Sequence, residues 1–211
     1  MNDHKNTKKF VLIACEESQT ICKAFREAGF NAFSNDIQKC SGGHPEWHII
    51  RNALDVIDSY GLFRLENGDF TPAIPHWDLV IAHPPCTYLA KSSAVAKAQG
   101  KQTIQQMIEG RMFFLNMWNC TAIHLCVENP VPLRAAELPP YTQIVNPFDF
   151  GHNFSKQTCL WLRNLPPLLP TRATYLNAPS YVNHCSHTSK RRSKTFAGIA
   201  EAMVEQWGNL I

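Results

Sequence analysis

The chain has 211 residues, of which 45% are hydrophobic and 18% charged, and this is enough for one well-buried domain with a small appendage. A formal net charge of +3 permits a nucleic-acid partner without requiring one. We expect a cytoplasmic protein, because no stretch approaches the roughly 18 apolar residues of a membrane span and residues 1–9 lack a secretory apolar segment.

The first predicted elements form a strand-helix-strand unit. Residues 10–15 are an apolar run typical of a buried strand, and residues 20–29 have the pattern of a helix that ends at a glycine. Residues 31–35 predict a second strand, which runs into Asp36.

The middle of the chain continues this alternation. A turn region at 49–55 is followed by a predicted strand at 79–82, a helix over about 103–120 and a strand at 123–127. The alternation predicts an α/β fold with a doubly wound, mostly parallel sheet. In such a sheet, ligands bind beyond the carboxyl ends of the strands.

Beyond Pro130 the sequence is rich in proline, which predicts loops and a few short strands rather than long helices. Residues 151–162 suggest a polar loop that feeds a strand. Apolar residues spaced four apart predict a closing helix over 197–207.

The eight cysteines have no paired spacing, and several lie in apolar runs, so we expect reduced core thiols rather than disulfides. Two clusters, around Cys40 and around Cys185, also contain histidines. Neither contains the Cys-x-x-Cys pair of a zinc site, so we expect no metal.

Reactive and polar side chains follow the predicted strands, in five groups that should converge on one crevice: residues 16–19, Asp36, Asp55, residues 84–86 and residues 128–130. Cys86 and Glu128 are the most informative of these. A sulfur nucleophile and a carboxyl acid, each delivered from a strand end, are what attack on an electron-poor heteroaromatic ring requires.

These positions also have structural interpretations. A lone cysteine such as Cys86 more often belongs to a core, and Glu128 could stabilise a helix N-terminus. The other acids could occupy turns or lie near a helix dipole: Asp36, Asp55, Glu16 and Glu17. The basic run at 186–195 is either a phosphate-contacting loop or a solvated turn.

The motifs occur in the order of a known family: the first strand and helix, Asp36, Pro84-Pro85-Cys86, Glu128-Asn129-Pro130, the loop and strand at 151–162, and a terminal helix. In this the chain resembles a compact, phage-type member of the DNA cytosine-5 methyltransferases. The resemblance implies a Rossmann-like methyltransferase fold, a place in the host cytoplasm, and S-adenosylmethionine-dependent transfer of a methyl group to carbon 5 of cytosine in DNA.

The resemblance also implies catalytic roles. The Cys86 thiolate would add to carbon 6 of a cytosine flipped out of the duplex. Glu128 would hold a proton against ring nitrogen 3, which needs a carboxyl whose pKa is raised by burial. Asn129 would orient that carboxyl or the base.

The remaining roles fall into two sets. The implied cofactor contacts are Ala14, Glu16, Glu17, Ser18, Gln19, Asp36 for the ribose hydroxyls, Ile37, Asp55 for the adenine amino group, and Pro84. The implied substrate contacts are Pro85, Lys156, Arg191 and Arg192. We expect residues 1–165 to form the catalytic domain, 166–192 a short substrate-recognition segment, and 193–211 a closing helix that packs back on the catalytic domain.

Two features depart from the family's pattern. Residues 15–19 contain no glycine where the family's first motif is glycine-rich, and Lys156-Gln157-Thr158 stands where Gln-Arg-Arg is usual. The recognition segment is also short, and a homodimer could supply the missing surface. The sequence therefore leaves two alternatives open: an enzyme that modifies a free pyrimidine nucleotide or transfers another group, and a non-catalytic cofactor-binding module.

Overall fold

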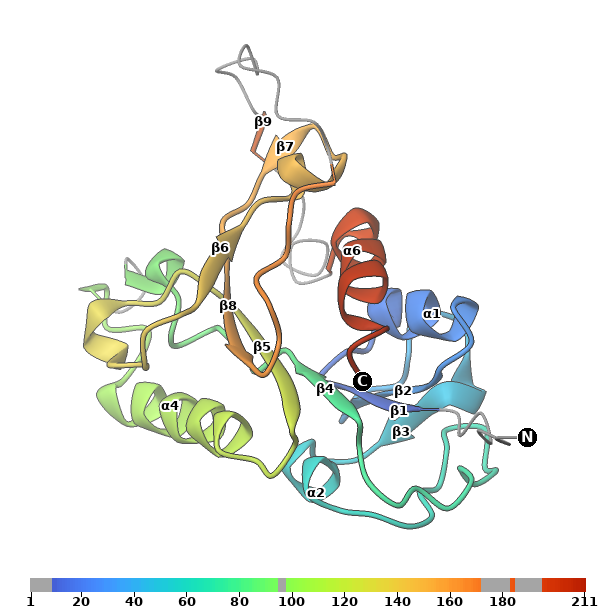
Figure 1. Cartoon of the computed structure of the whole chain (residues 1–211). Helices are drawn as coiled ribbons and strands as arrows, with labels where there is room; N and C mark the ends of the chain where they lie inside the picture. The colour runs from blue at the N-terminus through green and yellow to red at the C-terminus, as the bar shows by residue number, and fades with distance from the viewer. Residues whose placement is uncertain (1–8, 95–97, 172–182, 185–194) are drawn as a thin grey trace.

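A computed structural model describes residues 9–94, 98–171, 183–184 and 195–211 (Figure 1). Its main sheet has the strand order β3-β2-β1-β4-β5-β8-β6. The strands are β1 (Phe10–Ala14), β2 (Asn31–Asp36), β3 (His48–Ile50), β4 (Leu79–Ala82), β5 (His124–Pro130), β6 (Gln143–Val145) and β8 (Thr158–Arg163). The first five in spatial order run parallel, and β8 is antiparallel to both of its neighbours. The predicted α/β fold with a mostly parallel sheet is confirmed.

Helices cover both faces of the sheet, as Figure 1 shows. Because side chains alternate along a strand, β1 sends Val11 and Ile13 to one face and Leu12 and Ala14 to the other. The first face packs against α1 (Thr20–Glu27) and α6 (Ala197–Trp207), and the second against α2 (Leu54–Ile57) and α4 (Ile104–Trp118). No helix of the described residues is long and apolar enough to cross a bilayer.

Several predicted boundaries agree with the structure. The strand at 79–82 and the helix at 197–207 have the predicted limits. Helix α1 ends at Glu27, and Gly29 follows with φ 93°, a left-handed conformation that glycine adopts without strain. Helix α4 begins after Thr103, whose side chain accepts a hydrogen bond from the amide of Gln106 in a capping box.

Two regions differ from the prediction. Residues 49–55, expected to be a turn region, include part of β3 and the start of α2. Strand β5 continues three residues beyond the predicted end, because its last residues pair with the antiparallel β8, Glu128 opposite Leu160 and Pro130 opposite Thr158. Glu128 therefore lies within a paired strand and not in the loop after it.

The proline-rich region between β5 and α6 contains short elements in its described part. These are η3 (Arg134–Ala136), η4 (Pro147–Phe150), β7 (Phe154–Ser155) and β9 (Asn183–His184), which pairs with β7. Two further 3-10 turns, η1 (Pro45–Trp47) and η2 (Lys91–Ser93), lie earlier in the chain. Most of the expected recognition segment, including Arg191 and Arg192, lies outside the described residues.

Helix α6 returns to the parallel part of the sheet. Its apolar residues Ile199, Met203 and Trp207 are buried in the same cluster as Ile21 and Phe25 of α1. The Trp207 indole N–H also donates to the carbonyl of Pro166 at 3.0 Å. The closing helix thus shares a core with the first half of the chain.

Two helical glycines provide a test of how closely α6 packs. A Cβ atom at Gly198 would overlap the carbonyl oxygen of Phe150, whereas a Cβ at Gly110 of α4 would meet the Leu89 side chain at 3.5 Å, an ordinary contact. Both changes to alanine gain helix propensity, by about 1 kcal/mol. We expect Gly198→Ala to lower the free energy of unfolding by about 1–3 kcal/mol through overpacking and Gly110→Ala to raise it or leave it unchanged. Urea denaturation measures both, and equal effects would contradict the packing described.

Candidate active site

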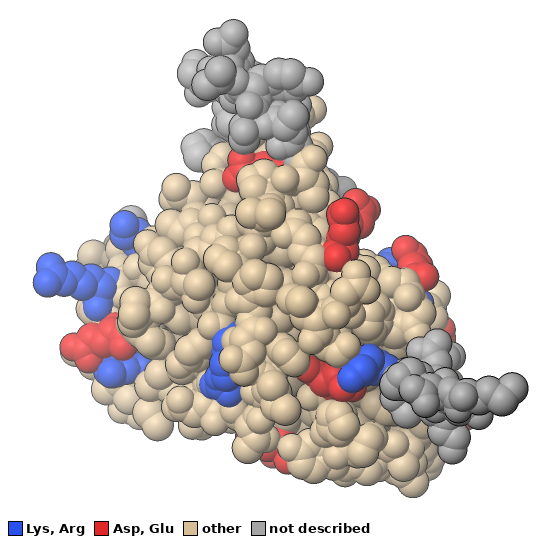
Figure 2. Space-filling view, viewed as in Figure 1, with Lys and Arg blue, Asp and Glu red and all other residues tan. Residues whose placement is uncertain are grey.

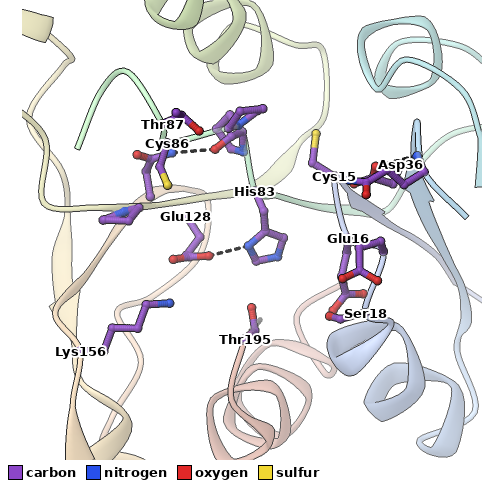
Figure 3. A pocket seen from close by; sticks show the side chains of 16 residues that line it. Cys15, Glu16, Ser18, Asp36, His83, Cys86, Thr87, Glu128, Lys156 and Thr195 are labelled. Atoms are coloured by element: carbon purple, nitrogen blue, oxygen red, sulfur yellow. Dashed lines mark hydrogen bonds and ion pairs between the residues drawn. The ribbon is translucent and has the colours of Figure 1, made fainter. Parts of the chain in front are cut away.

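A cavity of about 510 Å³ lies at the carboxyl ends of β1, β2, β4 and β5. This volume is within the range of small-molecule sites, about 300–1,000 Å³. Its lining comprises Cys15, Glu16, Glu17, Ser18, Asp36, Gln38, His83, Pro84, Pro85, Cys86, Thr87, Glu128, Asn129, Pro130, Lys156 and Thr195. Figure 3 shows Cys86, Glu128 and Lys156 on one side, Cys15, Glu16, Ser18 and Asp36 on the other, and His83 between the two groups.

Strand register determines which side chains meet in this cavity. Ala14 pairs with Ala82, and Ala82 pairs with Val127, so the ends of β1 and β4 lie beside Val127 of β5. The residue that follows each of these lines the cavity: Cys15, His83 and Glu128. The amide of His83 donates to the Ala14 carbonyl at 2.9 Å, which extends the β1 to β4 pairing by one residue.

The loop after β4 presents Cys86. The side-chain amide of Asn129 donates to the Pro84 carbonyl at 2.8 Å, and the Cys86 carbonyl accepts from the amides of Leu89 and Ala90 at 3.0 Å. Proline restricts the backbone of the loop as well. Cys86 is only partly buried, and it lines the cavity.

Burial and the negative charge of Glu128 raise the pKa of the Cys86 thiol, while the positive charge of Lys156 acts in the opposite direction. At neutral pH the resting side chain is therefore a thiol. Formation of the nucleophilic thiolate requires a group that takes the proton or a change in the charge of Glu128.

Glu128 is paired with a histidine. One carboxylate oxygen, Oε2, lies 2.6 Å from Nδ1 of His83, and both side chains are nearly buried. Burial alone would raise the pKa of Glu128, but the hydrogen bond and charge of His83, with a contribution from Lys156, outweigh it and lower this pKa. The expectation of a raised pKa for Glu128 is therefore wrong, because it did not include a buried cationic partner.

Glu16 caps the first helix. Its carboxylate accepts hydrogen bonds from the amides of Ile21 at 2.7 Å and Cys22 at 3.2 Å, which are otherwise unpaired at the start of α1. Burial raises the pKa of Glu16 to about 7, although the charge of His83 and the two amide hydrogen bonds act in the opposite direction. The structural interpretation of Glu16, a helix N-terminal acid, is thus supported.

Two residues of the loop without glycine, Cys15 and Gln19, have a left-handed backbone conformation. Cys15 has φ 60° and Gln19 has φ 58°, values that cost free energy outside glycine. The Gln19 side chain accepts from the His44 amide at 3.0 Å and donates to the His44 carbonyl at 2.8 Å. A Cβ at Gly42 would lie 2.5 Å from the Gln19 Cβ, so this close approach requires a glycine in the facing loop.

The other predicted cofactor residues differ in position. Asp36, at the end of β2, lines the cavity together with Glu17, Ser18 and Pro84. Four do not line it: Ala14, Gln19, Ile37 and Asp55. Ala14 and Gln19 are buried behind the cavity wall, Ile37 is exposed to solvent, and Asp55 is an exposed residue of α2. Of the predicted substrate residues, Pro85 and Lys156 line the cavity.

Sequence reasoning missed several of the cavity-lining residues: Gln38, His83, Thr87 and Thr195. His83 was given no role, although its place directly after β4 is the signal that identified its neighbours. Thr195, which precedes α6, lines the cavity through the return of that helix to the sheet. No sequence signal could place Thr195, because its position depends on tertiary packing.

Both histidines near Cys40 have partners, and the cluster around Cys185 lies outside the described residues except for His184. His48 is buried, with one ring nitrogen 2.8 Å from the Ser34 hydroxyl and the other 2.9 Å from the Gln38 carbonyl. His44 pairs with Glu46 at 2.9 Å. Within the described ranges there is no cluster of three or more side chains suited to a metal ion.

The raised pKa of Glu16 predicts a pH dependence. The carboxyl ionises near 4.5 when unfolded and near 7 when folded, so the folded state binds more protons in that window and Glu16 makes stability fall as pH rises through it. The free energy of unfolding of the native protein, minus that of Glu16→Gln, should decrease by up to about 3 kcal/mol from pH 4.5 to pH 7. Chemical denaturation across this range tests it, with Glu17→Gln as the control. A difference independent of pH would contradict the assignment.

Comparison with known proteins gives likenesses to solved structures. No protein-family model matches the chain, and no curated protein matches it. The chain is similar to a solved structure provisionally assigned as a DNA modification methyltransferase encoded within an E. coli prophage, with 13% sequence identity and a TM-score of 0.43. The match covers 74% of this chain and 46% of that one, so this chain spans less than half the length of its structural neighbour. A likeness at this level transfers neither activity nor substrate.

Proposed function

We propose that the protein is an S-adenosylmethionine-dependent DNA methyltransferase that acts on carbon 5 of cytosine. The observation that carries this proposal is the arrangement of one cavity, with Cys86, Glu128 and Lys156 on one side and the strand-end acid Asp36 on the other (Figure 3). The first group suits covalent chemistry on a pyrimidine. The second suits the hydroxyls of a ribose, because an acid at the end of the second parallel strand is where nucleotide ribose binds in such folds.

The cavity also has unsatisfied polar atoms that suit a polar ligand. Nε2 of His83 and Oδ1 of Asn129 are buried and lack a hydrogen-bond partner within the described residues. Asp36, Glu17, Ser18 and Pro84 would hold the cofactor. When bound, S-adenosylmethionine supplies an electrophilic methyl group.

Cys86 performs the first chemical step. Its S–H bond breaks and its sulfur bonds to carbon 6 of the cytosine, which moves an electron pair toward carbon 5. The proton that leaves the sulfur reaches ring nitrogen 3 by way of Glu128. The resting thiol and ionised carboxylate set the direction of this transfer, from Cys86 to Glu128. Both pKa shifts oppose it, so the transfer is coupled to formation of the bond to carbon 6 and to protonation of ring nitrogen 3. After methylation, the carbon 5 proton passes to solvent, and the electron pair of its C–H bond re-forms the ring double bond. The Cys86 sulfur leaves as a thiolate and recovers its proton from ring nitrogen 3 by way of Glu128.

Lys156 and Asn129 support this step. The positive charge of Lys156 lowers the pKa of both Cys86 and Glu128, so it favours the thiolate and offsets charge that builds on the ring. The hydrogen bond from Asn129 to the Pro84 carbonyl fixes the loop that carries Cys86 relative to β5, and so fixes the sulfur relative to Glu128.

A duplex substrate requires that the target base leave the helix stack to reach this cavity. Contacts to the phosphates would come from cationic side chains. On the face of the molecule in Figure 2, the described lysines and arginines are scattered among acids and do not form a continuous basic patch. The proposal keeps Arg191 and Arg192, which lie outside the described residues, as the phosphate contacts.

The covalent step can be trapped. Fluorine at carbon 5 cannot leave as a cation, so duplex DNA with 5-fluorocytosine at target positions should stay bonded to Cys86 when S-adenosylmethionine is present. We expect an increase in intact protein mass equal to the methylated oligonucleotide, no adduct for Cys86→Ser, and a normal adduct for Cys40→Ser, whose side chain does not line the cavity. Methylation without an adduct would rule out the route, and an adduct with 5-fluoro-dCMP but not with DNA would indicate a nucleotide substrate.

The role of Glu128 predicts a separation of rate from binding. Glu128→Gln removes the proton path, so single-turnover methylation should fall by about 10²–10⁴-fold, as for a lost acid–base group. The dissociation constant for S-adenosylhomocysteine should rise by no more than about tenfold, because the change reaches the cofactor side of the cavity only through the hydrogen bond of Glu128 to His83. A parallel loss of both would mean that Glu128 is chiefly structural.

A further inference from the structure

We propose that His83 binds the carboxylate of the cofactor's amino-acid portion through Nε2, while Nδ1 holds the catalytic carboxylate of Glu128. This inference rests on the proposed use of an adenosyl cofactor. It assigns His83 as a residue that determines which cofactor the cavity accepts. It also makes His83 the link between the cofactor and Glu128.

The usual anion site next to the first strand is already filled. In many nucleotide-binding folds, the free amides at the start of the first helix bind a negative group of the ligand. Here the Glu16 carboxylate occupies the amides of Ile21 and Cys22 at 2.7 and 3.2 Å. Those two amides are therefore not available to a ligand carboxylate in this cavity.

His83 offers such a donor. Its side chain is only 11% exposed, and Nε2 has no partner within the described part of the chain. A buried polar group without a partner costs free energy comparable to a lost hydrogen bond, so a cavity wall that retains one is built for a ligand atom or an ordered water. Because Nδ1 is held by Glu128 at 2.6 Å, the ring cannot turn away from the cavity without breaking that bond.

The charges around His83 favour its protonated form. Burial lowers the pKa of His83, but the hydrogen bond and charge of Glu128, together with the charge of Glu16, outweigh burial and the positive charge of Lys156, and the net effect raises this pKa. A protonated ring donates from both nitrogens, one to Glu128 and one to the ligand. A carboxylate would then contact a cation in a wall that also presents four acids: Glu16, Glu17, Asp36 and Glu128.

Lys156 is the other cation that lines the cavity among the described residues, and it suits this role less well. Figure 3 shows Lys156 on the side of Glu128 away from Glu16 and Ser18, whereas His83 lies between Glu128 and Glu16. The cofactor side of the cavity is thus closer to His83. Lys156 remains assigned to the base.

Two variants distinguish the roles of the two ring nitrogens of His83. The amide of His83→Asn can replace Nδ1 and keep the bond to Glu128, while it removes the Nε2 donor. The amide of His83→Gln can replace Nε2 and loses the bond to Glu128. Titration calorimetry would compare S-adenosylhomocysteine with its decarboxylated analogue. His76→Asn serves as a control, because His76 is an exposed histidine outside the cavity.

For the native protein and His76→Asn, we expect S-adenosylhomocysteine to bind about 10- to 100-fold more tightly than its decarboxylated analogue, as for one charge-assisted hydrogen bond. His83→Asn should reduce this ratio of the two dissociation constants to less than about threefold, and His83→Gln should keep a larger ratio than His83→Asn. The ratio for the native protein should shrink as pH rises through the pKa of His83, because the neutral ring keeps its proton on Nδ1.

The outcomes distinguish this inference from the proposed function. If the native protein binds both ligands equally, or if His83→Asn discriminates as well as the native protein, the assignment of His83 is overturned and cofactor use stands. If neither ligand binds, both proposals fail. Circular dichroism of each variant tests whether it is folded, so that a lost preference for the carboxylate-bearing ligand is not the result of unfolding.

Discussion

The parallel register that joins β1, β4 and β5 is the constraint on which the site depends. It brings the residues that follow Ala14, Ala82 and Val127 to one edge of the sheet, and these include His83 and Glu128. Their hydrogen bond of 2.6 Å is possible because they occupy adjacent positions on neighbouring strands. A shift of one residue in either strand would turn one of the two side chains to the other face.

The protonation states of Cys86 and Glu128 at rest are the opposite of those that the proposed reaction requires. A covalent mechanism needs a thiolate and a proton donor, but the resting site holds a thiol at Cys86 and an ion at Glu128. The ion is stabilised by His83, and its charge in turn holds the proton on the sulfur. The site is therefore stable at rest, and we infer that substrate binding starts the transfer of that proton.

Much of the fold could be predicted from the sequence, because strand runs and helix periodicity are local signals. The ends of β1, β2 and β4 followed from them to within one residue, and so did the presence of Cys86 and Asp36 at one edge. The partner of Glu128 could not be predicted, since it depends on register between strands. The exposed position of Asp55 was missed for a similar reason, because the chain after β3 turns into α2. Glu16 could be read either as a ligand or as a helix cap, and only its hydrogen bonds distinguish these roles.

The central claim is that this cavity methylates carbon 5 of cytosine. Mass spectrometry of nucleosides, from duplex DNA incubated with the purified protein and S-adenosylmethionine carrying a deuterated methyl group, tests it most directly. The account predicts 5-methyl-2′-deoxycytidine that carries the deuterated methyl group, and none with Cys86→Ser. A labelled methyl group on an amino nitrogen instead of carbon 5, or unmodified DNA from a protein that binds the cofactor, would contradict it.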